Sequence, residues 1–171
     1  MSDEAIASGL DDLLTETIRT LESLDIHEES LGVLKPAKGF AIFKTAASMV
    51  PAGKVWRLGV LLIDRDHRVY ATGEVTRALE PKIAVTNRSK QADLRRADRL
   101  AASRGPFPPG EVVNHLFTEL ATDPESLRAG SGPLSVQGET VMVRWDHTRD
   151  EQAIMPLDAY FKDRVSLLIL D

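Results

Sequence analysis

Arginine side chains recur at helical spacing in the middle of the chain, where they could bind an anion. Arg95, Arg96 and Arg99 lie on one helix-forming segment, and Arg88 leads into it. The guanidinium group forms paired hydrogen bonds with phosphate or carboxylate oxygens. A helix with few apolar residues and several arginines is suited to lie along a phosphate backbone. The anion-binding residues predicted on this basis are Arg88, Arg95, Arg96 and Arg99.

The same segment has features that oppose nucleic-acid binding. Asp93 and Asp98 interrupt the arginines, and the isoelectric point of the whole chain is about 5.4. The segment contains no aromatic residue that would stack on unpaired bases, and no helix-turn-helix or ribonucleoprotein motif is present. We therefore favour a solvated helix face, or one paired with acidic side chains of the N-terminus, and keep nucleic acid as an alternative partner.

A second candidate site is a set of metal-ligand side chains. Glu111, His115 and Glu119 stand four residues apart and would share one side of a helix. Carboxylate and imidazole groups at this spacing can hold a zinc or iron ion. Apolar residues occupy the adjacent side, so the same pattern is typical of any amphipathic helix. The paired histidines of helical metalloprotease sites are absent, and no cofactor is expected.

Nucleophilic catalysis lacks its usual residues in this chain. There is no cysteine, which also excludes disulfides and thiolate metal sites. No serine has a lysine three residues later, and neither a Gly-x-Ser-x-Gly nor a glycine-rich phosphate-binding motif occurs. Asp146 and His147 are neighbours in a polar segment that is typical of a turn. A hydrolase would need a pocket near His115, Arg57 and Glu74, which the sequence does not define.

Charge is distributed unevenly along the chain. Residues 1–31 carry a formal charge of −8, residues 32–104 carry +9 and residues 105–171 carry −6, which together give the net charge of −5. A basic middle of this kind either binds an anionic partner or is neutralised by the acidic ends of the chain.

Apolar periodicity, and helix propensity for residues 89–104, predict four helices that would position these side chains. The clearest covers residues 2–24, where Ile6 and Leu10 begin an apolar stripe and Ser2 is the expected N-cap. The first helix would pack on a sheet and present acidic residues outward. The other helices are predicted over residues 89–104, 111–121 and 157–168.

Alternating apolar residues predict two β-hairpins. The first covers residues 54–78 and reverses at residues 64–67, with His67 in the left-handed conformation. The second joins residues 134–137 to residues 140–146. Residues 40–43 (FAIF) are predicted as a short strand or a buried helical turn. These elements predict one α+β domain over residues 1–171, with an antiparallel sheet built from two hairpins and helices packed on it.

Three segments carry a resemblance to known proteins: residues 53–64 (GKVWRLGVLLID), 70–77 (YATGEVTR) and 143–145 (VRW). With them the chain resembles a group of small bacterial proteins, some of which carry a glutaminase label. Serine glutaminases use a Ser-x-x-Lys arrangement, and amidotransferase glutaminases use a cysteine nucleophile. Because this chain has neither, the resemblance assigns no catalytic residue.

Composition and the absence of targeting segments predict where the protein works. Arginine outnumbers lysine fourteen to seven, which is typical of bacteria with GC-rich genomes. The acidic start (MSDE) lacks the apolar stretch of a signal peptide, and the longest apolar run, residues 59–63, is too short to span a bilayer. We therefore expect a cytoplasmic bacterial protein without a membrane partner.

Together these observations favour a small non-catalytic binding or interaction domain that self-associates. A homo-oligomer would bring the acidic helix of one copy against the basic helix of another, and it would cover the apolar residues 165–170. Two alternatives stay open: an anionic ligand or nucleic acid bound through the basic helix, and a small hydrolase.

Overall fold

The protein has an α+β fold, as the sequence predicts. The computed structural model describes residues 2–40, 42–82, 89–149 and 151–170. The length of the chain predicts one domain, and within the structure the residues group into two compact units. Unit 1 comprises Met1–Glu28, Trp56–Thr72 and Thr118–Asp171, and unit 2 comprises Glu29–Val55 and Gly73–Phe117. Each unit is therefore assembled from stretches that are separated in sequence.

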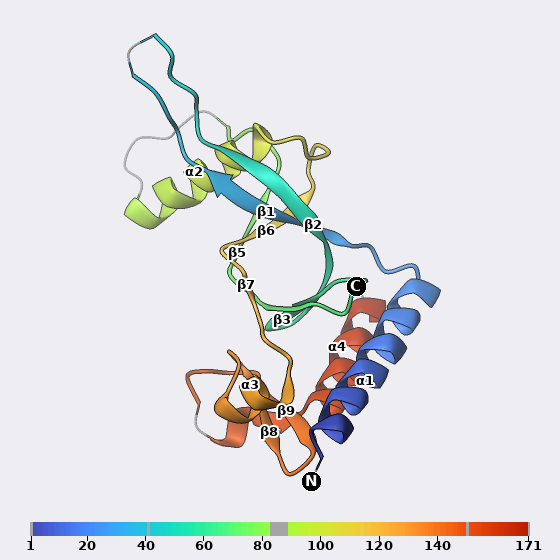
Figure 1. The fold of residues 1–171 in the computed structure, drawn as a ribbon. Coiled ribbons are helices and arrows are strands. Elements are labelled where there is room, and N and C mark those ends of the chain that lie inside the picture. The colour runs from blue at the N-terminus through green and yellow to red at the C-terminus, as the bar shows by residue number, and fades with distance from the viewer. Residues whose placement is uncertain (1, 41, 83–88, 150, 171) are drawn as a thin grey trace. The chain divides into compact units, whose positions relative to one another are not determined.

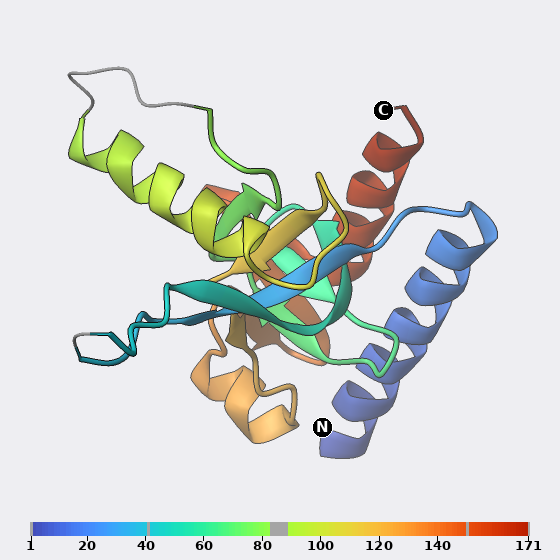
Figure 2. The same ribbon diagram turned by 90° about the horizontal axis from the view of Figure 1, so that it is seen from above.

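Two long helices of unit 1, α1 (Asp3–Ser23) and α4 (Leu157–Leu170), lie side by side (Figures 1 and 2). Helix α1 begins where the sequence predicts, because the Ser2 Oγ accepts a hydrogen bond from the Ala5 N–H at 3.2 Å. Its apolar stripe is buried in the core of unit 1, and α4 confirms the predicted C-terminal helix. No helix in the described part of the chain is both long enough and apolar enough to cross a bilayer.

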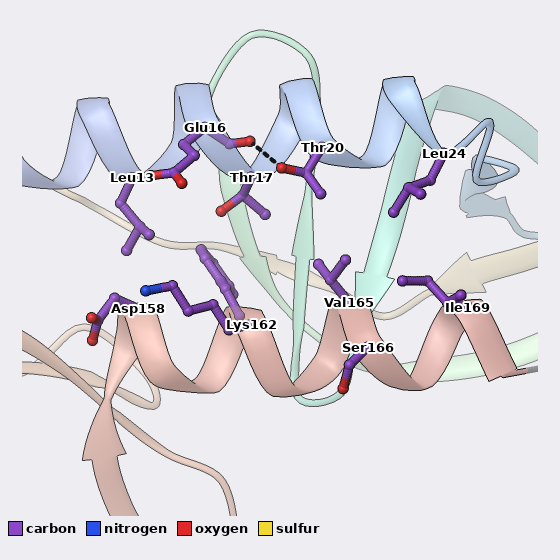
Figure 3. Close-up of a pocket in the computed structure, with 11 residues that line it drawn as sticks. Leu13, Glu16, Thr17, Thr20, Leu24, Asp158, Lys162, Val165, Ser166 and Ile169 are labelled. Atoms are coloured by element: carbon purple, nitrogen blue, oxygen red, sulfur yellow. Dashed lines mark hydrogen bonds between the residues drawn. The ribbon is translucent and has the colours of Figure 1, made fainter.

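A groove of about 230 Å³ runs between α1 and α4 (Figure 3). Leu13 and Thr17 line it from α1, and Val165 and Ile169 line it from α4. The apolar stretch predicted over residues 165–170 is only partly exposed, because Val165 belongs to the core. The exposed apolar side chains at this end of α4 are Leu167, Ile169 and Leu170.

The strands of unit 1 form two antiparallel sheets. The first contains the end of β2 (Ser48–Leu58), β3 (Leu61–Ile63), β4 (Val69–Ala71) and β7 (Thr118–Glu119). The second contains β8 (Leu134–Gln137), β9 (Thr140–Arg144) and β10 (Ile154–Pro156), and its β8–β9 pair confirms the second predicted hairpin. Two short helices, α3 (Pro124–Ala129) and η1 (Glu151–Ala153), connect these strands.

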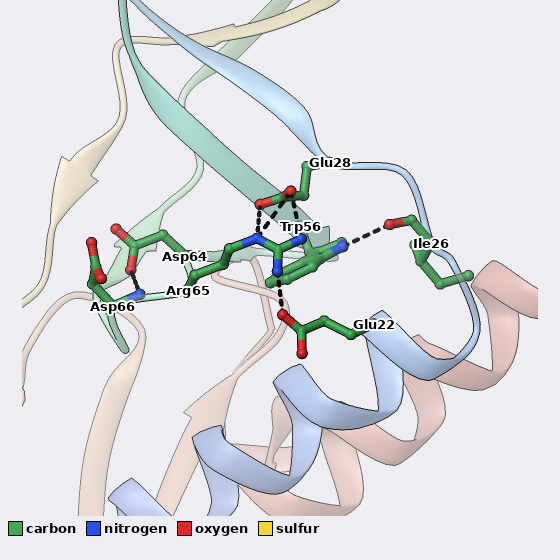
Figure 4. A network of polar contacts seen from close by, with 7 residues as sticks. All are labelled: Glu22, Ile26, Glu28, Trp56, Asp64, Arg65 and Asp66. Atoms are coloured by element: carbon green, nitrogen blue, oxygen red, sulfur yellow. Dashed lines mark hydrogen bonds and ion pairs between the residues drawn. The ribbon is translucent and has the colours of Figure 1, made fainter.

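The first predicted hairpin contains one turn that the sequence predicts and one that it does not. The predicted reversal follows β3, where the Asp64 carboxylate accepts a hydrogen bond from the Asp66 N–H at 2.9 Å (Figure 4). His67 has the expected left-handed conformation, with a φ of 63°. A second turn at Gly59, which has a φ of 62°, divides the outgoing strand into β2 and β3.

Unit 2 is a four-stranded sheet covered by one helix. Its strands lie in the order β5 (Glu74–Arg77), β6 (Val112–His115), β1 (Glu29–Lys35) and β2, and β2 continues into unit 1. The sheet is mixed, because β6 runs parallel to β1 and antiparallel to β5. Helix α2 (Lys90–Ser103) packs on β5 and starts after Ser89, as predicted, with a Ser89 hydroxyl cap.

The antiparallel pair β1–β2 ends in a turn that corrects the prediction for residues 40–43 (Figure 2). Phe40, Ile42 and Phe43 are 91%, 88% and 80% exposed, so this segment is neither a buried strand nor a buried helical turn. The prediction is wrong because apolar composition alone does not show whether a second layer covers a segment.

Candidate anion-binding site

Charge separates according to the two units. Unit 2 contains twelve Lys and Arg against six Asp and Glu, a formal charge of +6. Unit 1 contains nine against twenty, a formal charge of −11. The isoelectric point of the whole chain therefore conceals a basic structural unit.

The basic side chains of the two units also differ in their partners. Among the described residues of unit 1, ion pairs join five arginines to carboxylates of the same unit: Arg65, Arg68, Arg128, Arg149 and Arg164. Among the described Lys and Arg side chains of unit 2, only Lys54 does so, with its Nζ 2.7 Å from Glu111 Oε1. Within the described residues of unit 2, most of the positive charge therefore has no ion pair with a carboxylate of that unit.

Three guanidinium groups of unit 2 line one hollow of about 320 Å³ between α2 and β5. Arg95 and Arg99 are one helical turn apart on α2, and Arg77 is the last residue of β5. Two carboxylates, Glu74 and Asp98, also line the hollow, and none of its arginines forms an ion pair with them within the described residues. Because arginine is suited to paired hydrogen bonds with phosphate oxygens, this hollow is the candidate anion site of unit 2.

Backbone carbonyl groups hold two of these arginines in place. The Nε of Arg99 donates to the Leu79 carbonyl at 3.1 Å, and a terminal nitrogen of Arg77 donates to the Gly110 carbonyl at 3.3 Å. Each guanidinium has five N–H donors, so most of its donors stay available to a ligand. The carbonyl bonds thus orient the two cations without removing their charge.

The structure brings together only part of the anion site that the sequence predicts. Arg95 and Arg99 line the hollow, whereas Arg96 donates to the Lys82 carbonyl and is not among the lining residues. Arg88 lies outside the described residues. The sequence does not predict Arg77, because its position beside α2 depends on the pairing of β5 with β6, which no local pattern indicates.

A buried histidine lies next to the hollow. His115 on β6 is 3% exposed, its Nε2 is 3.9 Å from Asp98 Oδ2, and it pairs in register with Glu74. The predicted hydrolase would need a pocket near His115, Arg57 and Glu74; Glu74 lines the hollow, but Arg57 belongs to unit 1. Among the residues that line the hollow, Thr76 has the only hydroxyl group, and no hydrogen bond between it and His115 is present in the described structure.

The prediction of a helix over residues 111–121 is wrong, and the metal-site geometry that depends on this helix is wrong with it. These residues form β6 and β7 instead, separated by Leu116, which has a φ of 54°. Adjacent β-branched residues, Val112 and Val113, favour the strand. Glu111 is used within unit 2, where it bonds to Lys54 and accepts from the Ser30 hydroxyl at 3.0 Å.

The three predicted ligands accordingly do not share a helix face. His115 ends β6, and Glu119 lies on β7 in unit 1. Within the described ranges, no three His, Asp or Glu side chains are grouped so that they could hold a metal ion.

The fold and this site together define an α+β protein with one basic unit, in which three arginines line a hollow. Comparison of the chain with protein-family models, with curated proteins and with solved structures finds no match. The function is therefore argued from the site itself.

Proposed function

We propose that the chain is a non-catalytic nucleic-acid-binding protein of the bacterial cytoplasm, and that unit 2 binds the phosphate backbone. The observation that carries this proposal is the absence, in the described part of unit 2, of carboxylate partners for every Lys and Arg except Lys54. Cations that are not paired within the protein can neutralise phosphates and release the counterions that surround a nucleic acid.

The low isoelectric point of the whole chain argued against nucleic-acid binding, and the division into two units removes this objection. The acidic residues that lower the isoelectric point lie mainly in unit 1, where arginines already pair with several of them. Of the two acids within the basic helix, Asp98 lies 3.9 Å from the buried His115 and also lines the hollow. Arg95 is left exposed on the same helix without an ion-pair partner in the described structure.

The proposal is tested by the fluorescence anisotropy of a labelled DNA duplex over a series of salt concentrations. We expect the logarithm of the association constant to fall linearly with the logarithm of salt concentration, by about 0.9 for each phosphate neutralised. The variant Arg95→Ala/Arg99→Ala should reduce this slope by about 2 and weaken binding to all sequences alike. The matched control is Arg144→Ala/Arg149→Ala, which removes two exposed arginines of unit 1.

Two results would overturn the proposal. One is the absence of duplex binding even at low salt. The other is an equal loss of binding in both double variants, which would show that only the net charge of the chain matters. Circular dichroism of each variant checks that α2 remains folded after Arg99 loses its bond to Leu79.

Self-association is a second candidate function, and the exposed end of α4 favours it. Leu167, Ile169 and Leu170 are exposed beside the groove between α1 and α4, and a second copy of the chain would cover them. The variant Leu167→Lys/Ile169→Lys should then convert a dimer into a monomer in size-exclusion chromatography with light scattering. A wild-type protein that is monomeric at all concentrations contradicts self-association and leaves nucleic-acid binding untouched.

A further inference from the structure

Unit 2 carries a two-stranded arm, which we define as residues 33–50. Met49 anchors its base in the core of unit 2, whereas the described residues of its tip are exposed. Its strands are paired in the register Val33–Val50, Leu34–Met49 and Lys35–Ser48, and the arm extends away from the sheet (Figures 1 and 2). Beyond β1 and β2, Lys38 and Thr45 exchange two backbone hydrogen bonds of 3.1 and 2.7 Å. One isolated bridge therefore joins the two sides of the arm beyond the ends of β1 and β2.

The tip of the arm consists of large apolar side chains in water. Phe40 and Phe43 are among the most exposed large apolar residues of the chain, and Ile42 lies between them. Exposed apolar groups in such a cluster are typical of a surface that binds a partner. Their position at the end of a paired ribbon allows them to reach into a partner without rearrangement of the sheet.

Backbone contacts connect the described residues on either side of the tip. The Phe43 N–H donates to the Phe40 carbonyl at 3.2 Å, which closes a turn. Gly39 has a φ of 108°, and a Cβ at this position would lie 2.0 Å from the Phe43 carbonyl oxygen. A residue with a Cβ would clash there, so position 39 requires glycine.

Charge complementarity indicates the chemistry of the partner. The arm contains three lysines and no acidic residue: Lys35 and Lys38 precede the tip, and Lys44 follows it. All three are exposed and have no ion-pair partner in the described structure. A ribbon with cations on both of its strands matches a groove that has a row of phosphates along each side.

We propose that the arm enters a groove of double-stranded DNA and that Phe40 and Phe43 insert against a base step. This inference rests on the proposed nucleic-acid function of unit 2. In it, the arginine hollow and the lysines contact phosphates, and the tip unstacks bases. Apolar side chains used as wedges in this way kink a duplex, and the larger protein surface that a bent duplex touches offsets the cost of unstacking. The tip also supplies the aromatic groups that the basic helix lacks.

Duplex DNA fits the arm better than two other anionic partners. The major groove of an RNA duplex is too narrow and deep for a ribbon, and its bases are not reached from there. A lipid surface presents phosphates in one plane, whereas the arm carries lysines before and after the tip and shares its unit with three arginines that line a hollow. Arginine is the residue suited to paired contacts with individual phosphates.

The test uses the full chain and a DNA duplex that contains 2-aminopurine, a base whose fluorescence rises when it is unstacked. We expect fluorescence to rise on binding of the wild-type protein and to stay unchanged with Phe40→Ala/Phe43→Ala. This variant should lower duplex affinity at least about tenfold, because each lost base–aromatic contact weakens binding substantially. Its salt slope should equal that of the wild type, since no cation is removed.

Two control variants separate the tip from other causes. Trp145→Ala removes an exposed aromatic group from unit 1. It should leave the 2-aminopurine fluorescence change and the duplex affinity as they are in the wild type. Lys38→Ala/Lys44→Ala should reduce the salt slope by about 2. Because these side chains are exposed, all the variants are expected to fold, and circular dichroism verifies it.

The outcomes distinguish the two proposals. If the wild-type protein does not bind DNA, both fail. If it binds with the expected salt slope but the tip variant behaves like the wild type, the insertion is overturned and the phosphate-binding function stands. If the tip is needed for binding to phosphatidylserine vesicles and not to DNA, the arm serves a lipid surface and the inference is wrong.

Discussion

The guanidinium carbon of Arg65 lies 4.9 Å from the centre of the Trp56 ring, so the cation covers one face of a buried indole (Figure 4). The same guanidinium forms ion pairs with Glu22 and Glu28. On the other side of the ring system, the indole N–H donates to the Ile26 carbonyl at 2.9 Å. The turn after β3 is thereby joined to the segment that follows α1.

We expect Arg65→Ala to lower the free energy of unfolding and to change the fluorescence of Trp56. Arg65→Lys should recover only part of the loss, because lysine keeps the charge but neither stacks flat on the ring nor pairs with both oxygens of Glu28. The measurement is urea unfolding followed by fluorescence in a Trp145→Phe background, since the chain has two tryptophans. Arg128→Ala, which loses an ion pair with Asp3 but no aromatic contact, is the control. If Arg65→Ala and Arg128→Ala lower the free energy of unfolding equally, the contact between Arg65 and the Trp56 ring does not contribute to stability.

Tyr160 on α4 holds the tight turn between β2 and β3. Its hydroxyl accepts from the Val60 N–H at 2.8 Å and donates to the Leu58 carbonyl at 3.2 Å. Removing it with Tyr160→Phe leaves buried backbone groups without partners, so we expect a loss of about 1–3 kcal/mol in the free energy of unfolding. Urea unfolding measures this loss, and Ser166→Ala on the exposed side of α4 is the control.

The same turn predicts that two substitutions are coupled. A Cβ at Gly59 would lie 2.0 Å from the Tyr160 hydroxyl oxygen, so Gly59→Ala should destabilise the protein strongly. In Gly59→Ala/Tyr160→Phe that oxygen is absent. We therefore expect the free energy of unfolding of the double variant to fall by less than the sum of the decreases in the two single variants. Additive losses in a double-mutant cycle would mean that the positive φ of Gly59, rather than the contact, sets the cost.

Local signals explain which parts of the fold could be predicted. The caps Ser2 and Ser89 and the apolar stripe of α1 are contained in short stretches of sequence, and the helices begin where these residues indicate. The positive φ of His67 is predictable because the length of its loop requires one. Features that a few neighbouring residues determine can thus be predicted from one sequence.

Long-range pairing explains what could not be predicted. The segment that follows Glu111 has the periodicity of an amphipathic helix, yet β6 pairs with β1 and β5, and its burial comes from those strands. The hollow formed by Arg77, Arg95 and Arg99 depends on the same pairing, so the sequence indicates only the two helical members. The separation of charge into two units likewise appears only when distant stretches are assembled.

Alkaline pH should destabilise the protein through Tyr70. Burial, followed by the hydrogen bond to Asp64 and the charge of that carboxylate, raises the pKa of Tyr70 from 10.0 to about 12. Between these two values the unfolded chain loses the phenol proton more readily than the folded chain, so stability is full below pH 10 and falls as pH rises towards 12. Tyr70→Phe should flatten this part of the stability profile, measured by urea unfolding at pH 9, 10 and 11. The chain has only one other tyrosine, Tyr160, so a slope that is unchanged in Tyr70→Phe would contradict the assignment.

Arg77 tests whether the hollow, rather than the overall charge of unit 2, binds phosphate. Arg77 and Arg104 are both exposed arginines of unit 2, and each donates to one backbone carbonyl at 3.3 Å. Only Arg77 lines the hollow with Arg95 and Arg99. We therefore expect Arg77→Ala to reduce the salt slope of duplex binding by about 1, and Arg104→Ala to leave it nearly unchanged. Anisotropy titrations of the two variants at matched salt concentrations measure the difference. If both variants lose affinity to the same extent, the phosphates respond to the charge of the whole unit and the hollow is not a site.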